Sequence, residues 1–164
     1  MTCQAFRYLV LMPRWLSDEE QRAWRGLLEM TGRLDAHVNR QLQDVSGLSK
    51  ADYDVLVPLS EAPDGRLRMF EVARALCWHQ SRLSHHLARM QKRGLVERED
   101  CTSDRRGAFV VLTPSGREAI ETAAPAHVAT IRSVVFDGLT GEQVAALTAI
   151  SELVLQRLDG SRWG

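Results

Sequence analysis

A cationic stretch near the middle of the chain holds the side chains best suited to binding chemistry. Residues 81–93 read SRLSHHLARMQKR and contain two histidines, four cations and no acidic residue. In a helix, at 100° per residue, Leu83, Leu87 and Met90 gather on one side. The opposite arc carries Arg82, His85, Arg89 and Lys92. One face could therefore pack into a core while the other is offered to an anion; a merely solvated cationic face is the simpler alternative.

Net charge gives a different picture when it is resolved along the chain. The 164 residues include 21 basic and 21 acidic side chains, a balance that at first argues against a nucleic-acid partner. Between Arg66 and Arg106, however, ten basic residues face five acidic ones, which gives +5 and leaves −5 for the remainder. This asymmetry is typical of a cationic surface for a polyanion on an otherwise acidic body.

Hydrophobic periodicity and capping signals predict the helices that position this segment. A capping box, Ser17 with Glu20, should begin a long helix that ends at Gly47. Ser49 should cap a second helix, which ends at the turn over 63–65. Shorter helices are expected over 70–77 and 81–93, the latter closed by Gly94. The inner face of the first of these two is predicted to be Phe70, Val72, Ala73 and Leu76.

The second half of the chain is predicted to hold one hairpin and two further helices. Residues 95–100 and 108–113 favour strands, and a polar, arginine-containing tip joins them. A helix should start at Pro114 and run towards Phe136, with a kink or break at Pro125. A capping box, Thr140 with Gln143, should open the last helix. Its apolar seam is Val144, Leu147, Ile150, Val154 and Leu158. The fold class expected is mainly α with a small β-hairpin (α+β).

A short helix, a turn, a basic helix and a hairpin form the pattern of a helix-turn-helix with a β wing. Such a unit can place the basic helix in a DNA major groove and the hairpin tip in the adjacent minor groove. The tip, over 102–107, reads TSDRRG. An arginine there would benefit from the negative potential of a narrow groove.

The sequence resembles the MarR (multiple antibiotic resistance regulator) family of winged-helix transcription factors. The resemblance rests on SRLSHHLARMQKRGLVERE over 81–99 and SDRRGAFVVLTPSGR over 103–117, and helix order and length match over roughly 17–160. The wing pattern of the family is Asp-x-Arg, a strand, and Leu-Thr-x-x-Gly, matched by Asp104, Arg106, Leu112, Thr113 and Gly116. The resemblance implies a sequence-specific, double-stranded DNA-binding transcriptional regulator, with a repressor relieved by a small-molecule effector as the usual mode.

The same resemblance assigns individual roles. Arg106 would reach the minor groove, Asp104 would orient it, and Arg105 would meet the DNA backbone. The recognition-helix positions that would touch DNA are Gln80, Ser81, Arg82, Ser84, His85, Arg89 and Lys92. Among these, Arg82 suits bidentate guanine readout, whereas Ser84 and Arg89 suit phosphates.

A homodimer on a pseudo-palindromic operator is also implied, with recognition helices in successive major grooves about 10 base pairs apart. Residues 17–48 and 114–164 would form the helical dimerisation region, residues 49–113 the winged helix-turn-helix domain, and residues 1–16 an N-terminal arm. The apolar seams of the terminal helices are compatible with this, although composition does not distinguish a dimer seam from an intramolecular one.

The resemblance also implies an effector cleft, apolar and aromatic, where the dimerisation helices meet the winged helix. Trp24, His37, Tyr53 and Leu56 are the candidate lining residues for a small aromatic or apolar effector. Simple core or interface packing is the alternative for each of them.

Metal- and redox-responsive regulation are alternatives within the same fold. Cys77, His79, His85 and His86 lie close in sequence, but helical geometry does not converge them, so no metal or other cofactor is predicted. For His85 and His86 we expect contact with DNA or solvent. A cysteine switch would have to use Cys3, Cys77 or Cys101, for which burial or an incidental position is the alternative.

Other classes of protein fit the sequence less well. No nucleophile–base pair at an identifiable spacing, glycine-rich phosphate loop or HExxH motif occurs, so we do not expect an enzyme. A helical protein-interaction adaptor without DNA binding would leave the basic helix and the wing arginines unexplained. Three scattered cysteines fit a reducing cytoplasm, and the apolar run 8–12 is too short to span a membrane. We therefore expect a cytoplasmic, nucleoid-associated protein without a membrane partner.

Overall fold

The computed structural model of the chain describes residues 15–100 and 108–160. Contacts between Cα atoms divide it into two units, the first ending at Ala36 and the second starting at His37. In the first unit, helix α1 (Asp18–Ser46) begins at the predicted capping box. The backbone N–H of Ser17 donates to Glu20 Oε2 at 2.7 Å, and that of Glu20 to Ser17 Oγ at 3.2 Å. The predicted start of this helix is confirmed.

The second unit contains the end of α1 and all the remaining elements. Its helices are α2 (Lys50–Glu61), α3 (Met69–Ala75), α4 (Gln80–Lys92), α5 (Pro114–Ile131), the π-helical turn η1 (Arg132–Phe136) and α6 (Gly141–Gly160). Its strands are β1 (Arg66–Arg68), β2 (Val96–Asp100) and β3 (Ala108–Leu112). They form an antiparallel sheet in the order β1-β3-β2, in which Val110 of β3 pairs with Leu67 and with Arg98. The expectation of a mainly helical chain with a small β wing is confirmed.

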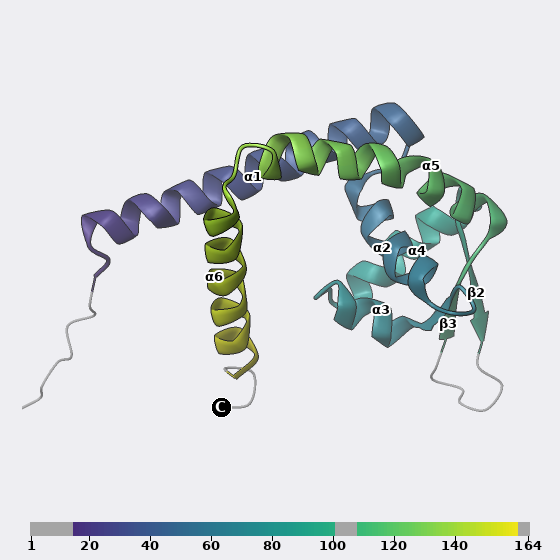
Figure 1. Ribbon diagram of the computed structural model, residues 1–164. Coiled ribbons are helices and arrows are strands. Elements are labelled where there is room, and N and C mark those ends of the chain that lie inside the picture. The colour runs from purple at the N-terminus through teal and green to yellow at the C-terminus, as the bar shows by residue number, and fades with distance from the viewer. Residues whose placement is uncertain (1–14, 101–107, 161–164) are drawn as a thin grey trace, which may run out of the picture. The chain divides into compact units, whose positions relative to one another are not determined.

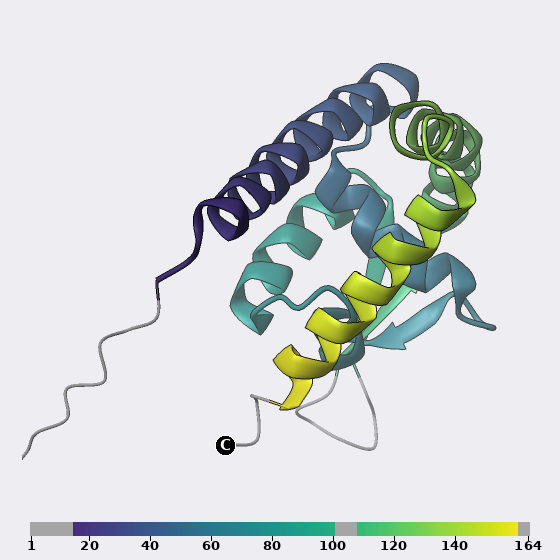
Figure 2. The ribbon, with the colours of Figure 1, turned by 60° about the vertical axis from the view of Figure 1, so that its left-hand side comes forward.

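The core of the second unit brings α2, α3, α4 and the sheet together, as Figures 1 and 2 show. Leu83, Leu87 and Met90 of α4 are at most 3% exposed, which confirms the predicted inner face of this helix. The other elements supply the remaining fully buried aliphatic side chains, among them Leu42, Val55, Leu56, Leu59, Val72, Val96 and Val110. The core therefore fixes which face of α4 is turned outward.

The sheet has one strand more than predicted. β1 is a three-residue Arg-Leu-Arg segment with no alternating pattern long enough to read, and it exists because it pairs with β3. Strand β3 is consequently the centre of the sheet, with a neighbour on each edge. A hairpin prediction based on residues 95–113 alone could not include this partner.

One prediction about the helices was wrong, and a second is narrowed. Phe70 is 49% exposed, because α3 buries Val72 and Ala73, and at 100° per residue Phe70 lies about 110° from the midpoint of that pair. At Pro125 the break does not occur, because α5 continues to Ile131 and passes into η1; a kink, the other predicted outcome, stays a prediction. A proline removes one backbone hydrogen bond, and here the helix is maintained on both sides of that gap. Across residues 15–100 and 108–160, no helix combines the length and hydropathy that a membrane span requires.

Candidate nucleic-acid interface

Helix α4 ends at a glycine, as predicted. Gly94 has φ +71°, a left-handed conformation that favours residues without a Cβ atom. Its N–H donates to Gln91 O at 2.9 Å, and the N–H of Leu95 donates to Met90 O at 3.1 Å. These bonds satisfy carbonyls at the end of the helix and direct the chain into β2.

The seven recognition-helix residues singled out from the sequence all lie on α4. Ser84 is half-buried, and the other six are exposed: Gln80, Ser81, Arg82, His85, Arg89 and Lys92. The structure thus presents these polar and cationic side chains on a helix whose opposite face is in the core. Their contact with DNA remains a prediction.

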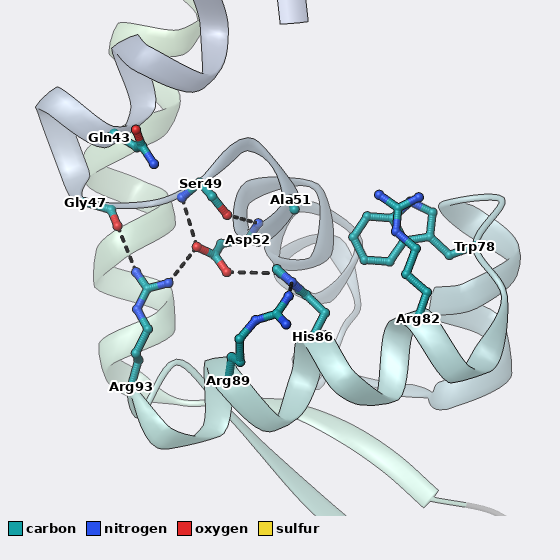
Figure 3. Close-up of a pocket in the computed structure, with 10 residues that line it drawn as sticks. All are labelled: Gln43, Gly47, Ser49, Ala51, Asp52, Trp78, Arg82, His86, Arg89 and Arg93. Atoms are coloured by element: carbon teal, nitrogen blue, oxygen red, sulfur yellow. Dashed lines mark hydrogen bonds and ion pairs between the residues drawn. The ribbon is translucent and has the colours of Figure 1, made fainter. Parts of the chain in front are cut away.

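On the inner side, Asp52 joins α4 to the turn between α1 and α2 (Figure 3). Its carboxylate is 3% exposed. Oδ2 accepts hydrogen bonds from Arg93 Nη1 at 2.6 Å and from the backbone N–H of Ser49 at 2.9 Å, while Oδ1 lies 3.1 Å from His86 Nε2. Arg93 also donates through Nη2 to the carbonyl of Gly47 at 2.8 Å. The predicted cap at Ser49 is confirmed, and its partner in the capping box is this same aspartate.

The ionisation of Asp52 follows from these contacts. Burial alone would raise the pKa of its carboxyl, but the adjacent His86 imidazole and hydrogen bonds from Arg93 and Ser49 outweigh that effect and hold the pKa well below its ordinary value. Asp52 is therefore a buried carboxylate that is matched by cationic and polar donors. It anchors α4 through groups that lie 34 and 41 residues further along the chain.

His86 is not a solvent or DNA contact, so that interpretation was wrong. Its ring is 7% exposed, and Nδ1 lies 3.0 Å from Arg89 Nη2. Because a guanidinium can only donate, Nδ1 accepts, and Nε2 carries the proton beside Asp52. At 100° per residue His86 lies about 40° from Met90, on the buried side of α4. The periodicity of the helix could have revealed this placement.

Trp78, in the turn between α3 and α4, is a site residue that the sequence analysis did not single out. Its ring meets that of His86 edge to face, with centroids 5.5 Å apart and planes at 89°. The guanidinium carbon of Arg82 lies 4.0 Å from the centroid of the Trp78 ring, an arrangement visible in Figure 3. A cavity of about 390 Å³ adjoins this group and is lined by Gln43, Gly47, Ser49, Ala51, Asp52, Trp78, Arg82, His86, Arg89 and Arg93.

The strands of the wing are confirmed, whereas the tip is not described. The predicted wing contacts Asp104, Arg105 and Arg106 lie outside the described residues. Arg66 and Arg68 of β1 both lie over the ring of Phe109, at 3.9 and 4.9 Å from its centroid, and Arg66 also forms an ion pair with Glu99 of β2 at 3.2 Å. Since β1 was not predicted, sequence reasoning missed this pair.

The Leu-Thr-x-x-Gly motif joins the wing to α5. Thr113 Oγ1 donates towards the carbonyl of Gly94 at 2.6 Å and accepts from the N–H of Gly116 at 2.9 Å, which makes it the predicted cap of the helix. A Cβ atom on Gly116 would collide with the carbonyl oxygen of Leu95. The glycine is needed for this close approach between helix and chain.

The candidate effector-cleft residues occupy different environments. Leu56 is fully buried in the core, which fits the alternative that it packs in the core and does not contact an effector. Tyr53 is 9% exposed, and the centroid of its ring lies 4.6 Å from the centroid of the His127 ring. His37 is exposed and borders a separate cavity of about 350 Å³ on α1, and Trp24, in the first unit, is 52% exposed.

The metal and redox alternatives gain little from the structure. In the described ranges, no group of three or more His, Cys, Asp or Glu side chains is placed to hold a metal ion. Cys77 is an exposed free thiol with φ +53°. Cys3 and Cys101 lie outside the described residues.

Comparisons with known proteins agree with this arrangement. The model of the MarR family matches residues 46–107. Sco3205, a MarR family transcriptional regulator from Streptomyces coelicolor crystallised in complex with DNA, is 46% identical, with a TM-score of 0.85 over 89% of this chain and 92% of that one. AbsC, another MarR family transcriptional regulator from Streptomyces coelicolor, is 43% identical, with a TM-score of 0.85 over 90% of this chain and 99% of AbsC.

Among curated proteins, the transcriptional regulator HosA of Escherichia coli is 32% identical over 89 residues, which is 54% of this chain. The match spans 64% of the length of HosA. The chain belongs to the MarR family of transcriptional regulators.

Proposed function

We propose that this protein binds double-stranded DNA sequence-specifically as a homodimer and regulates transcription. The observation that carries the proposal is the division of α4 into a buried face and an exposed cationic face. The helix follows a short helix and a turn and precedes a β wing, which is the order of a helix that enters a major groove. The relative Sco3205 was crystallised with DNA, which supports the same conclusion.

Within this proposal, residues 49–113 form the DNA-binding domain. Arg82 reads guanine in the major groove, Ser84, Arg89 and Lys92 contact phosphates, and Arg106 enters the minor groove with Asp104 orienting it. Because phosphate contacts release counterions, the logarithm of the affinity falls steeply with the logarithm of salt concentration.

Residues 17–48 and 114–164 supply the dimerisation region. In a single chain, the apolar seam of α6 is exposed to solvent: Ile150, Val154 and Leu158 are each at least 48% exposed. In α1, Trp24, Leu27 and Leu28 are each at least 46% exposed. Apolar surface of this extent on two long helices is typical of an interface, and a second copy of the chain is the partner that fits a pseudo-palindromic operator.

Regulation completes the proposal. We propose a repressor that a small aromatic or apolar effector releases from its operator in the cytoplasm, with no metal, no cofactor and no enzymatic reaction. The candidate contacts for the effector are the exposed Trp24 and His37 and the phenol of the largely buried Tyr53. Leu56 packs in the core. A cysteine-dependent or metal-dependent response is the alternative mode of control.

Selection from a random duplex library with the purified protein tests DNA binding. We expect an inverted repeat whose half-sites are centred about 10 base pairs apart. The Arg82→Ala and Arg106→Ala variants should bind the selected duplex more weakly, whereas Arg22→Ala, the same change on an exposed turn of α1, should not. Recovery of no inverted repeat, together with unchanged binding by the first two variants, would contradict the proposal. An adaptor without DNA binding would also fail to be retained on duplex DNA at low salt.

A further inference from the structure

We infer that Trp78 is a positioning residue for base recognition, which holds the guanidinium of Arg82 in place on the exposed face of α4. The inference rests on the proposed function, since it assigns the source of specificity within the same interface. Its basis is the stacking of Arg82 on Trp78, at 4.0 Å from the guanidinium carbon to the ring centroid (Figure 3).

Trp78 is well suited to act as a fixed platform. Its backbone N–H donates to Ala73 O at 2.9 Å, which ties the turn to α3. Its ring is half-buried and meets the His86 ring edge to face at 5.5 Å. His86 is in turn held between Asp52 and Arg89, at 3.1 and 3.0 Å. The indole is therefore supported from the core on one side and free to receive a cation on the other.

Arg82 needs such support because, within residues 15–100 and 108–160, no hydrogen bond or ion pair from another residue of α4 holds its guanidinium. It lies in the first turn of the helix, where its side chain is exposed, and a long exposed side chain otherwise samples many rotamers. A guanidinium attracted to the face of a tryptophan keeps its N–H edge available for a planar, bidentate acceptor such as guanine. Stacking thus reduces the conformational freedom that binding would have to remove.

Arg89 provides a contrast on the same helix. Its guanidinium donates directly to His86 Nδ1, so it is held by a hydrogen bond to the buried network and not by the indole. Loss of the Trp78 ring should therefore affect Arg82 selectively. The consequence is a loss of discrimination between DNA sequences with little change in general attraction to phosphates.

The experiment measures the affinity of the full-length dimer for the duplex obtained by selection and for a scrambled duplex of equal length. The specificity ratio is the dissociation constant for the scrambled duplex divided by that for the selected duplex. For Trp78→Ala we expect this ratio to fall roughly tenfold, because each of the two half-sites loses part of the energy of one bidentate base contact. Trp78→Phe keeps an aromatic face and should retain most of the ratio. The salt dependence of binding to the scrambled duplex should not change in either variant.

Combination with Arg82→Ala separates positioning from general structure. If Trp78 acts through Arg82, then Trp78→Ala should alter the ratio less than about twofold in the Arg82→Ala background. An equal fall in both backgrounds, an unchanged ratio in the single variant, or tighter specific binding after removal of the ring would each overturn the inference. Should Trp78→Ala fold poorly by circular dichroism, Trp78→Leu, which keeps apolar bulk but has no aromatic face, replaces it in both backgrounds with the same expected results. Failure of the proposed function is recognised separately, because the wild-type protein would then not discriminate between the duplexes.

Discussion

The carboxylate of Asp52 and the guanidinium of Arg93 meet at 2.6 Å between Oδ2 and Nη1, although 41 residues separate them in sequence. Asp52 stands in the first turn of α2, and Arg93 directly follows α4. Through this pair, and through His86, the helix proposed to enter the major groove is fastened to the turn between α1 and α2. The orientation of α4 thus depends on a buried charge as well as on apolar contacts.

Replacement of Asp52 by Asn should reduce stability markedly at neutral pH. The variant loses the charge that faces Arg93 and His86, and we expect a cost of about 2 kcal/mol in the free energy of unfolding, measured by urea denaturation at pH 7. Asp54→Asn is the matched control on the same helix. It removes a partly exposed ion pair with Lys50, whose expected contribution is below about 1 kcal/mol. Equal effects of the two changes would contradict the anchoring role of Asp52.

The contribution of Asp52 should also vanish in acid. Its folded-state pKa lies below the ordinary value of 3.8, so the unfolded chain takes up the proton first as pH falls. The stability difference between the wild-type protein and Asp52→Asn should therefore be fully present above pH 3.8 and shrink below it. Urea denaturation at pH 7, 5 and 3 would show this, and a difference that grows towards pH 3 would disprove it.

His127 should make the protein less stable in mild acid. Burial and the charge of Lys50 lower its pKa below the ordinary 6.5, while Asp54 acts in the opposite direction. Because the folded state resists protonation, stability is retained above pH 6.5 and is lost as pH falls through the folded-state pKa. His127→Phe keeps a ring against Tyr53 and removes the titration. The free energy of unfolding of His127→Phe minus that of the wild-type protein should therefore increase as pH falls from 7.5 to 5.5. A difference that does not change with pH would count against this role of His127.

Gly116→Ala should destabilise the junction between the wing and α5. The new methyl group would meet the backbone carbonyl of Leu95, which cannot move as a side-chain end can. Overpacking of this kind costs about 1–3 kcal/mol, observable as a lower melting temperature. Gly26→Ala on α1, where nothing lies within 4 Å of the added carbon, should instead be neutral or slightly stabilising. A tolerated Gly116→Ala would mean that helix and strand separate easily.

Arg82 and Lys92 should differ in how they contribute to DNA binding. Arg82→Ala should cost ~1–3 kcal/mol per half-site and relax one base preference. Lys92→Ala should weaken binding to all sequences alike and reduce the slope of affinity against salt. Fluorescence anisotropy titrations over a salt series, with single-base variants of the selected duplex, measure both effects. Identical profiles for the two variants would remove the distinction between base and phosphate contacts.

A charge on the apolar seam of α6 should dissociate the proposed dimer. Val154→Arg places a cation on a seam that is proposed to be covered by a second copy, so the molar mass measured by light scattering should fall towards one chain. Gln156→Arg is the control, because at 100° per residue position 156 lies on about the opposite side of the helix from the middle of the seam. A Val154→Arg protein that keeps the wild-type mass would exclude α6 from the interface.

The sequence by itself determined the local features of this protein. Capping boxes at Ser17 and Thr140, the cap at Ser49, the glycine after α4, and the apolar periodicity of α4 located helices and their faces correctly. Each of these signals lies within a few residues of the structure it specifies. The resemblance to the MarR family followed from equally local motifs.

Tertiary structure alone decided which distant groups meet. β1 exists through pairing with β3, and Asp52 finds His86 and Arg93 only when α2 packs beside α4. The stacking of Arg82 on Trp78 likewise depends on the path of the turn after α3. The physical reason is that hydrogen bonds, ion pairs and ring contacts act over a few ångströms in space, whereas a sequence pattern reports only separations along the chain.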